Sequence, residues 1–216
     1  DLGIIDFVLS PGSRNAPLSI ALHEASKRGL VNLHIRIDER TAAFFALGII
    51  KATRRPAALV CTSGTAVANY YPAFLEAFHS NLPLYVLSAD RPARLRQTGA
   101  NQTTNQVHLF NCGRYFDGSN YEFHANGPTH INLEFDEPLL SEKQSNWLED
   151  LASDNLITEN LVEEELLIPK GKGIVIAGHD SVDVSELVAQ LQVPLIAENP
   201  LSYSNAVAHA SLFLGQ

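Results

Sequence analysis

Short apolar runs alternate with longer amphipathic stretches along the first half of the chain. Four of these runs are rich in Val, Ile, Leu or aromatic residues, as β-strands are, and they cover Ile4–Leu9, Leu33–Ile37, Ala57–Cys61 and Leu84–Leu87. The intervening segments are long enough for helices, which we predict over Asn15–Arg28, Arg40–Thr53 and Ala66–Ser80. This alternation predicts parallel strands joined by crossover helices, an α/β doubly wound sheet.

Two of the predicted helices have unusual sequences. The segment Arg40–Thr53 is apolar almost all round, which predicts burial on more than one side, in the core or against another subunit. Pro72 is awkward inside the third helix, but a start near Asn69 would place it in the first turn, where a missing N–H costs little.

The rest of the chain suggests two domains. Thr129–Leu133 is predicted to close the first sheet, which gives a domain over residues 1–138. Residues 139–172 are acidic and read as a linker with a short helix. Residues 173–216 begin a second α/β pattern, which we expect to be incomplete, with elements over Ile174–Ala177, Val182–Leu191 and Val193–Ala197.

Composition excludes several classes of protein. The net charge of -9 argues against a nucleic-acid-binding protein, because such proteins need concentrated positive charge. The two cysteines, Cys61 and Cys112, lack metal-ligand spacing, as do the eight histidines, of which His34 and His130 are predicted to be structural. No apolar run approaches the roughly 20 residues of a membrane span. We therefore expect a reduced, cytoplasmic protein without a metal site of its own.

Polar or glycine-containing segments follow each of the first four predicted strands. Parallel sheets bind ligands at the carboxyl ends of their strands, so these segments predict a binding site on one edge. They are Ser10–Asn15, Asp38–Arg40, Thr62–Thr65 and Ser88–Pro92, and the long loop Arg94–Gln106 follows the last of them.

Two of these segments offer hydrogen-bond donors. Ser13 and Arg14 open a helix, where free N–H groups and a guanidinium favour an anionic ligand. The alternative is that Ser13 or Asn15 simply caps the helix. Ser63–Thr65 likewise presents hydrogen-bond donors to a ligand. The alternative is that this segment is only a tight turn between a strand and a helix.

Other candidates carry charge or amide groups. Glu39 lies where a strand ends and an apolar helix begins, so partial burial would prepare its carboxyl group to share a proton with a ligand nitrogen. Alternatively it is a helix-start carboxylate favoured by the macrodipole. Arg91 is either a substrate clamp or an ion-pair partner of Asp90, and Asn101 and Gln102 are amide donors on a loop.

Together these segments resemble a known family. FVLSPGSRNAPLSIAL, IRIDERTAAFFALGIIKAT, ALVCTSGTAVANYYPAFLEA and VLSADRPARLRQTGANQTTNQ are similar to the pyrimidine-binding domain of the 2-succinyl-5-enolpyruvyl-6-hydroxy-3-cyclohexene-1-carboxylate synthases, which are thiamine-diphosphate-dependent transferases of menaquinone biosynthesis. GPTHINLEFDEPL resembles the closing strand of that domain, and GIVIAGHDS resembles the start of the central domain.

The resemblance implies an activity and roles for particular residues. Thiamine diphosphate would decarboxylate 2-oxoglutarate, and the succinyl unit would add to isochorismate. Glu39 matches the catalytic glutamate that hydrogen-bonds the aminopyrimidine ring, and the adjacent cofactor-binding candidates are Ser63, Gly64 and Thr65. The residues matching the isochorismate carboxylate site are Ser13, Arg14, Arg91, Asn101 and Gln102.

The chain also departs from the family pattern. It has no Gly-Asp-Gly motif followed by an Asn at the spacing that holds Mg²⁺ and the diphosphate. We therefore expect these ligands from a C-terminal domain absent from this chain, and we expect the fragment alone to be inactive. The resemblance implies a homodimer or homotetramer for the parent protein. The stretch between Phe110 and Gly127 is too short for the helix that the family has there.

Two alternatives remain from the sequence. One is the pyrimidine domain of another thiamine-diphosphate enzyme, such as an acetolactate synthase or a decarboxylase. The other is a non-catalytic module that binds an anion or a nucleotide.

Overall fold

The computed structural model describes most of the chain, and its residues divide into two units, Asp1–Glu159 and Asn160–Gln216. The described residues are 3–118, 120, 122, 124, 126–140, 148–149, 167–168, 171–178, 181–199 and 202–208. The predicted linker over 139–172 with its short helix lies mostly outside them, so the domain boundaries remain predictions.

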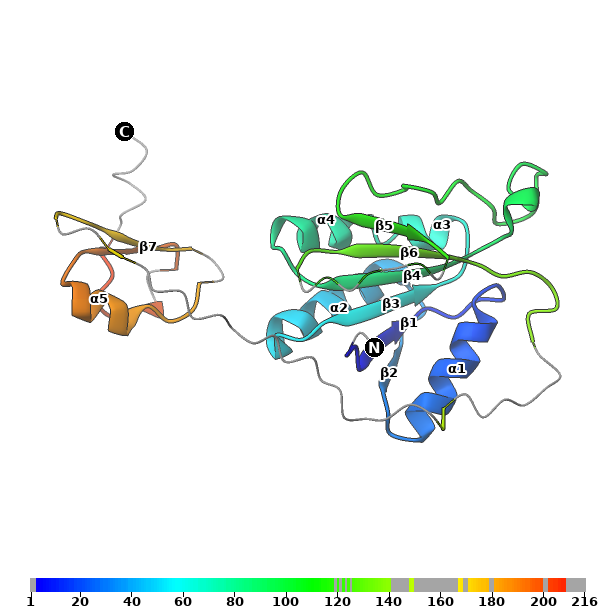
Figure 1. Ribbon diagram of the computed structural model, residues 1–216, viewed down its shortest axis with the longest axis horizontal. Helices are drawn as coiled ribbons and strands as arrows, with labels where there is room; N and C mark the ends of the chain where they lie inside the picture. Colours follow the sequence, from blue (N-terminus) through cyan, green and yellow to red (C-terminus); the bar gives the residue numbers. More distant parts are fainter. Residues whose placement is uncertain are drawn as a thin grey trace. The chain divides into compact units, whose positions relative to one another are not determined.

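Six strands form the sheet of the first unit, and every neighbouring pair is parallel. Their order is β2-β1-β3-β4-β6-β5 (Figure 1). The strands are β1 Asp6–Leu9, β2 Asn32–Ile35, β3 Ala57–Cys61, β4 Leu84–Asp90, β5 Arg114–Asp117 and β6 Thr129–Glu134. β2 lies on one side of β1, and the later strands lie on the other side. This order confirms the predicted doubly wound α/β fold.

Helices cover both faces of this sheet (Figure 1). They are α1 Ala16–Lys27, α2 Glu39–Thr53, α3 Thr65–Ala68 and α4 Tyr71–His79, and the 3₁₀ turn η1 spans Ala93–Leu95. Leu18 and Leu22 of α1 pack on one face, against Leu9 and Val60. The buried side chains of α2, α3 and α4 pack on the other face with the alternate strand residues, in the largest core of the unit. Since successive strand residues point to opposite faces, each strand contributes to both cores.

The predicted third helix is divided into two. α3 ends at Ala68, and α4 begins at Tyr71 with Pro72 in its first turn. Proline lacks the N–H that a continuous helix would need at that point, and in a first turn that loss costs little. The expectation of a separate start near Asn69 is therefore confirmed.

The edge strand β5 was not predicted. It has a charged residue at each end, Arg114 and Asp117, and is only half-buried, so it lacks an apolar run. It runs parallel to its neighbour β6, which starts at Thr129. Among the described residues between Phe110 and Gly127, β5 is the regular element.

α2 starts with a local cap. The Asp38 side chain accepts a hydrogen bond of 2.8 Å from the Thr41 N–H, and this bond holds the pKa of Asp38 below its usual value. One side of α2 is buried through Ala42, Ala46 and the other core residues, whereas Phe44 is 49% exposed. The predicted burial on a second side therefore remains a prediction about another subunit.

The second unit has a small parallel sheet of two strands. Its elements are β7 Val175–Ala177, α5 Ser185–Leu191 and β8 Leu195–Ala197, in the predicted order. α5 packs through Val188 against Ala177 and Leu195, and Ile176 is exposed. In neither unit is any described helix both long and apolar enough to cross a bilayer.

Candidate functional site

The turn after β1 is closed by a buried asparagine. Asn15 is the residue before α1, but it makes no side-chain cap bond to the helix. Its amide instead accepts a hydrogen bond from the Gly12 N–H at 2.8 Å and donates one to the Ser10 carbonyl at 2.9 Å. A Cβ on Gly12 would lie 2.5 Å from Cβ of Thr62, so only glycine lets the tips of β1 and β3 meet here.

This turn directs Arg14 towards the segment after β6. Nη1 of Arg14 donates to the Phe135 carbonyl at 3.0 Å, and Nη2 lies 3.4 Å from a carboxylate oxygen of Glu137. The buried Nε of Arg14 has no hydrogen-bond partner among the described residues. An unpaired buried donor on a cation is costly, so this guanidinium suits a further acceptor such as a ligand carboxylate.

The turn after β3 holds the second arginine of the edge. Nη1 of Arg91 donates to Oγ of Ser63 at 2.7 Å and to the main-chain carbonyl of Gln102 at 2.8 Å. Oγ of Ser63 donates to the same carbonyl at 2.9 Å. Gly64 follows with φ of +83°, and a Cβ there would lie 2.9 Å from the Gln102 carbonyl. The loop from 94 to 106 thus folds back onto the end of β3.

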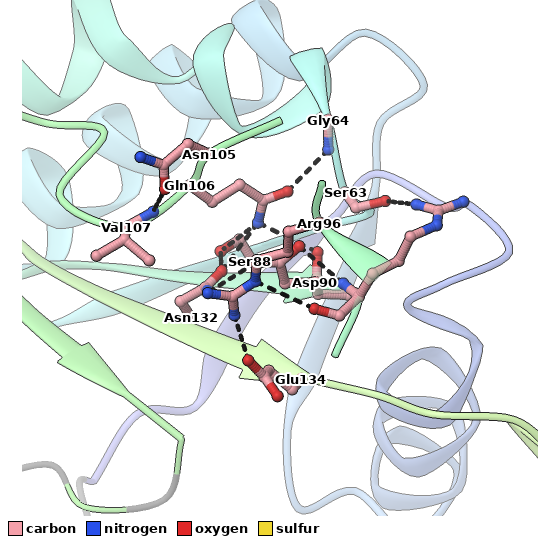
Figure 2. Close-up of polar contacts among 12 residues, drawn as sticks. Ser63, Gly64, Ser88, Asp90, Arg96, Asn105, Gln106, Val107, Asn132 and Glu134 are labelled. Atoms are coloured by element: carbon pink, nitrogen blue, oxygen red, sulfur yellow. Dashed lines mark hydrogen bonds and ion pairs between the residues drawn. The ribbon is translucent and has the colours of Figure 1, made fainter. Parts of the chain in front are cut away.

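Gln106 anchors that loop from inside (Figure 2). Its side chain is fully buried, and its Oε1 accepts from the Gly64 N–H at 2.8 Å. Its Nε2 donates to Oδ1 of Asn132 at 2.9 Å and lies 3.3 Å from both Oγ of Ser88 and the carbonyl of Ala89. One amide therefore connects the ends of β3, β4 and β6.

A buried carboxylate continues this network. Asp90 ends β4 with no solvent exposure and accepts from the Arg91 N–H at 2.7 Å and from Nδ2 of Asn132 at 2.9 Å. Nε of Arg96 lies 3.1 Å from the same carboxylate, and Arg96 also pairs with Glu134. A buried charge with this many donors is stable, and it fixes the main chain at Arg91.

Glu39 lies at the same carboxyl edge, at the start of α2. It is half-buried, and its carboxylate makes no hydrogen bond or ion pair to a described residue. Burial raises the pKa of the nearby Cys61 thiol and Tyr70 hydroxyl, and the charge of Glu39 contributes to both shifts. The carboxylate is therefore close enough to act on Cys61, at the end of β3, and on Tyr70, the residue before α4.

The predicted site residues differ in how they are held. Arg91, Ser63 and the main chain of Gln102 are in direct contact, and the Gly64 N–H donates to Gln106 instead. The other candidates have exposed side chains that make no hydrogen bond to either arginine within the described part of the chain, namely Ser13, Thr65 and Asn101.

Three residues of the site were not predicted. Gln106 and Asn132 are polar side chains buried within segments whose motifs were recognised, and Glu137 lies just beyond β6. The only signal in the sequence was a polar residue amid apolar strand positions, as Asn132 is between Ile131 and Leu133.

The described residues fit one part of thiamine diphosphate. A half-buried carboxylate without an internal partner, as at Glu39, suits the N–H of an aminopyrimidine ring. Among the residues that the structure describes, no group of three His, Cys, Asp or Glu side chains could hold a metal ion. The part of the cofactor that the described residues suit is therefore its pyrimidine ring, through the carboxylate of Glu39.

The fold and this edge define an α/β domain that carries two arginines, Arg14 and Arg91, and the carboxylate of Glu39 at the carboxyl ends of its parallel strands. Residues 1–109 match the family model of the thiamine pyrophosphate enzyme, N-terminal TPP binding domain. The chain belongs to this family of thiamine pyrophosphate enzymes, as the sequence motifs predicted.

Curated relatives are more specific in name. A 2-succinyl-5-enolpyruvyl-6-hydroxy-3-cyclohexene-1-carboxylate synthase of Nocardioides sp. is 46% identical over 202 residues, covering 92% of this chain and 37% of the relative. The synthase of the same name from Thermobifida fusca is 38% identical over 245 residues, covering 97% and 44%. That of Geobacillus thermodenitrificans is 57% identical over 113 residues, covering 52% and 18%. The chain thus spans less than half the length of each of these relatives.

Proposed function

We propose that this chain forms the pyrimidine-binding half of a thiamine-diphosphate-dependent synthase. The proposed reaction decarboxylates 2-oxoglutarate and transfers the succinyl unit to isochorismate in menaquinone biosynthesis. The names of the relatives support this proposal over an acetolactate synthase, a decarboxylase or a non-catalytic module. The observation that carries it is the unpaired Glu39 carboxylate on the same sheet edge as Arg14 and Arg91.

In this proposal Glu39 accepts a hydrogen bond from the aminopyrimidine ring and holds the proton that the ring exchanges. The bound cofactor supplies the electron sink for decarboxylation. Ser63, Gly64 and Thr65 line the cofactor at the end of β3. The Gly64 N–H already donates to Gln106, so we assign this turn a role in close approach rather than in donating hydrogen bonds.

The isochorismate carboxylate is assigned to the two arginines of the edge. Arg91 is fixed by two neutral acceptors, so its positive charge remains available to a ligand. Arg14 contributes the second guanidinium and an unpaired buried Nε. The exposed polar groups proposed to complete the carboxylate site are Ser13, Asn101 and Gln102.

Further parts of the site are proposed to come from outside the described residues. Mg²⁺ and the diphosphate would be held by the diphosphate-binding domain that other enzymes of this kind carry. A homodimer or homotetramer would bring that domain to the edge of the sheet, and the exposed Phe44 on α2 is consistent with a subunit contact there. The first binding measurement is calorimetric titration of the chain with thiamine diphosphate and Mg²⁺, for which we expect no tight binding.

The decisive variant is Glu39→Gln in the assembled enzyme, assayed with 2-oxoglutarate and isochorismate. Removal of a proton-transfer group lowers turnover about 10²- to 10⁴-fold, and isochorismate binding should persist. Glu24→Gln, an exposed carboxylate on α1, is the matched control and should leave turnover unchanged. Unchanged turnover in Glu39→Gln would refute the proposed role of the carboxylate.

A further inference from the structure

One of the two arginines of the edge forms an ion pair with an exposed carboxylate. The Arg14 side chain is only 9% exposed, whereas that of Glu137, its ion-pair partner, is 76% exposed. The distance of 3.4 Å between Nη2 and Oε1 is long for a charge-assisted hydrogen bond. The shorter bond of Arg14, 3.0 Å to the Phe135 carbonyl, holds the guanidinium in place without Glu137.

The field of Glu137 reaches the second arginine as well. Burial lowers the pKa of Arg91, the neighbouring Arg14 lowers it further, and Asp90 and Glu137 oppose both effects. The two guanidinium groups therefore share one patch of positive charge, which two carboxylates partly neutralise.

Only one of these two carboxylates is free to leave. Asp90 is fully buried and accepts hydrogen bonds from Arg91 and Asn132 in addition to its pair with Arg96. Removing it from these partners would strand a buried charge. Glu137 has solvent on most of its surface, so its carboxylate returns to water when it leaves the buried Arg14, and its 3.4 Å contact with Nη2 is a long one to lose.

We propose that Glu137 is an internal counter-ion of the carboxylate site, which an incoming substrate carboxylate displaces from Arg14. This inference rests on the proposed function, because it takes the arginine pair as the site of the isochorismate carboxylate. Binding then replaces the carboxylate of Glu137 on Arg14 with that of the substrate. The net electrostatic contribution of Arg14 to binding is therefore small. A weakly charged or neutral compound cannot make this exchange, and Glu137 thus sets selectivity for carboxylates without touching the reacting atoms.

The test compares isochorismate binding to the assembled enzyme and to its Glu137→Gln and Asp136→Asn variants by calorimetry, with thermal unfolding of each. Glu137→Gln removes the competing charge with little change of shape, and its Kd should fall about two- to fivefold, as the modest strength of a long ion pair with one exposed partner implies. Asp136→Asn is the matched control, since the adjacent Asp136 pairs with Arg94 and its charge acts on Arg14 only more weakly. Its Kd should change by less than that of Glu137→Gln.

The outcomes separate this inference from the proposed function. Tighter binding by Glu137→Gln alone, with unchanged unfolding temperature and a steeper loss of affinity with added salt, supports the counter-ion role. Equal affinity in the wild type and Glu137→Gln, or equal tightening in Asp136→Asn, overturns it and leaves the proposed function standing. If no variant binds isochorismate, the carboxylate site itself is refuted. Binding by Glu137→Gln alone, with none by the wild type, supports a stronger competition.

Discussion

The buried amide of Gln106 offers the sharpest test of how the edge of the sheet is held together. Gln106→Leu removes the acceptor of the Gly64 N–H and the donor to Asn132, all within the core. Oδ1 of Asn132 keeps the hydrogen bond from Oγ of Ser88, so the Gly64 N–H is the group left without a partner. An orphaned buried donor costs about 1 to 3 kcal/mol, and each lost hydrogen bond costs about 1 kcal/mol more.

We therefore expect Gln106→Leu to lower the free energy of unfolding by about 3 kcal/mol, measured by urea unfolding with circular dichroism. Gln97→Leu is the matched control, because Gln97 lies in the same loop with an exposed side chain. Surface substitutions of this kind usually change stability by less than about 0.5 kcal/mol. The reasoning fails if the two variants are equally stable.

Gln106→Glu adds a pH test of the same contacts. The new carboxyl keeps an acceptor for the Gly64 N–H, but its second oxygen faces the acceptors of Asn132 and Ala89. Burial and these acceptors raise its pKa in the folded state above the unfolded value of about 4.3. Its stability relative to wild type is therefore highest below that value and falls by about 1.4 kcal/mol per pH unit as pH rises towards the folded pKa. A difference from wild type that does not vary with pH would refute the assigned orientation of the amide.

Three further predictions concern other residues of the first unit. Burial lowers the pKa of His130 to about 3 in the folded protein. The contribution of the neutral imidazole to folding stability is therefore complete above the unfolded pKa of about 6.5, and it is lost as pH falls towards the folded pKa. The free energy of unfolding of the wild type should fall by about 2 kcal/mol between about pH 6.5 and pH 5. The fall should be smaller in His130→Gln. The control His23→Gln, on the exposed face of α1, should show the same fall as the wild type. Gly12→Ala should destabilise by about 1 to 3 kcal/mol through contact with Thr62, and Gly48→Ala, with open space in the middle of α2, should stabilise by about 0.5 to 1 kcal/mol in the same unfolding assay.

The sheet followed from the sequence because buried parallel strands have continuous apolar runs. Ala57–Cys61 is buried at every position, and its bounds were predicted without error. β5 was missed for the converse reason, since an edge strand with charged ends carries no such run. The break before Tyr71 could be predicted because Pro72 lacks the backbone N–H that a continuous helix would need at that point.

The contacts within the site could not be read in this way. Gln106 reaches Gly64 across 42 positions of sequence, and nothing in either segment specifies that partner. The sequence placed Asn15 as a possible cap, but its amide closes the turn at Gly12 instead. Such bonds depend on which tips the fold brings together, a property of the sheet order rather than of any single motif.

The two arginines of the edge are held by different chemistry, and that difference has a functional consequence. Arg91 is fixed by Ser63 and Gln102, which are neutral acceptors tied to the core through Gln106, so it is placed before any ligand arrives. Preorganised donors spend little of the binding energy on ordering side chains. Arg14 is instead held by a carbonyl and partly neutralised by a displaceable carboxylate. In the proposed site Arg91 would therefore set the position of the substrate carboxylate, and Arg14, through the exchange with Glu137, would set how strongly it binds.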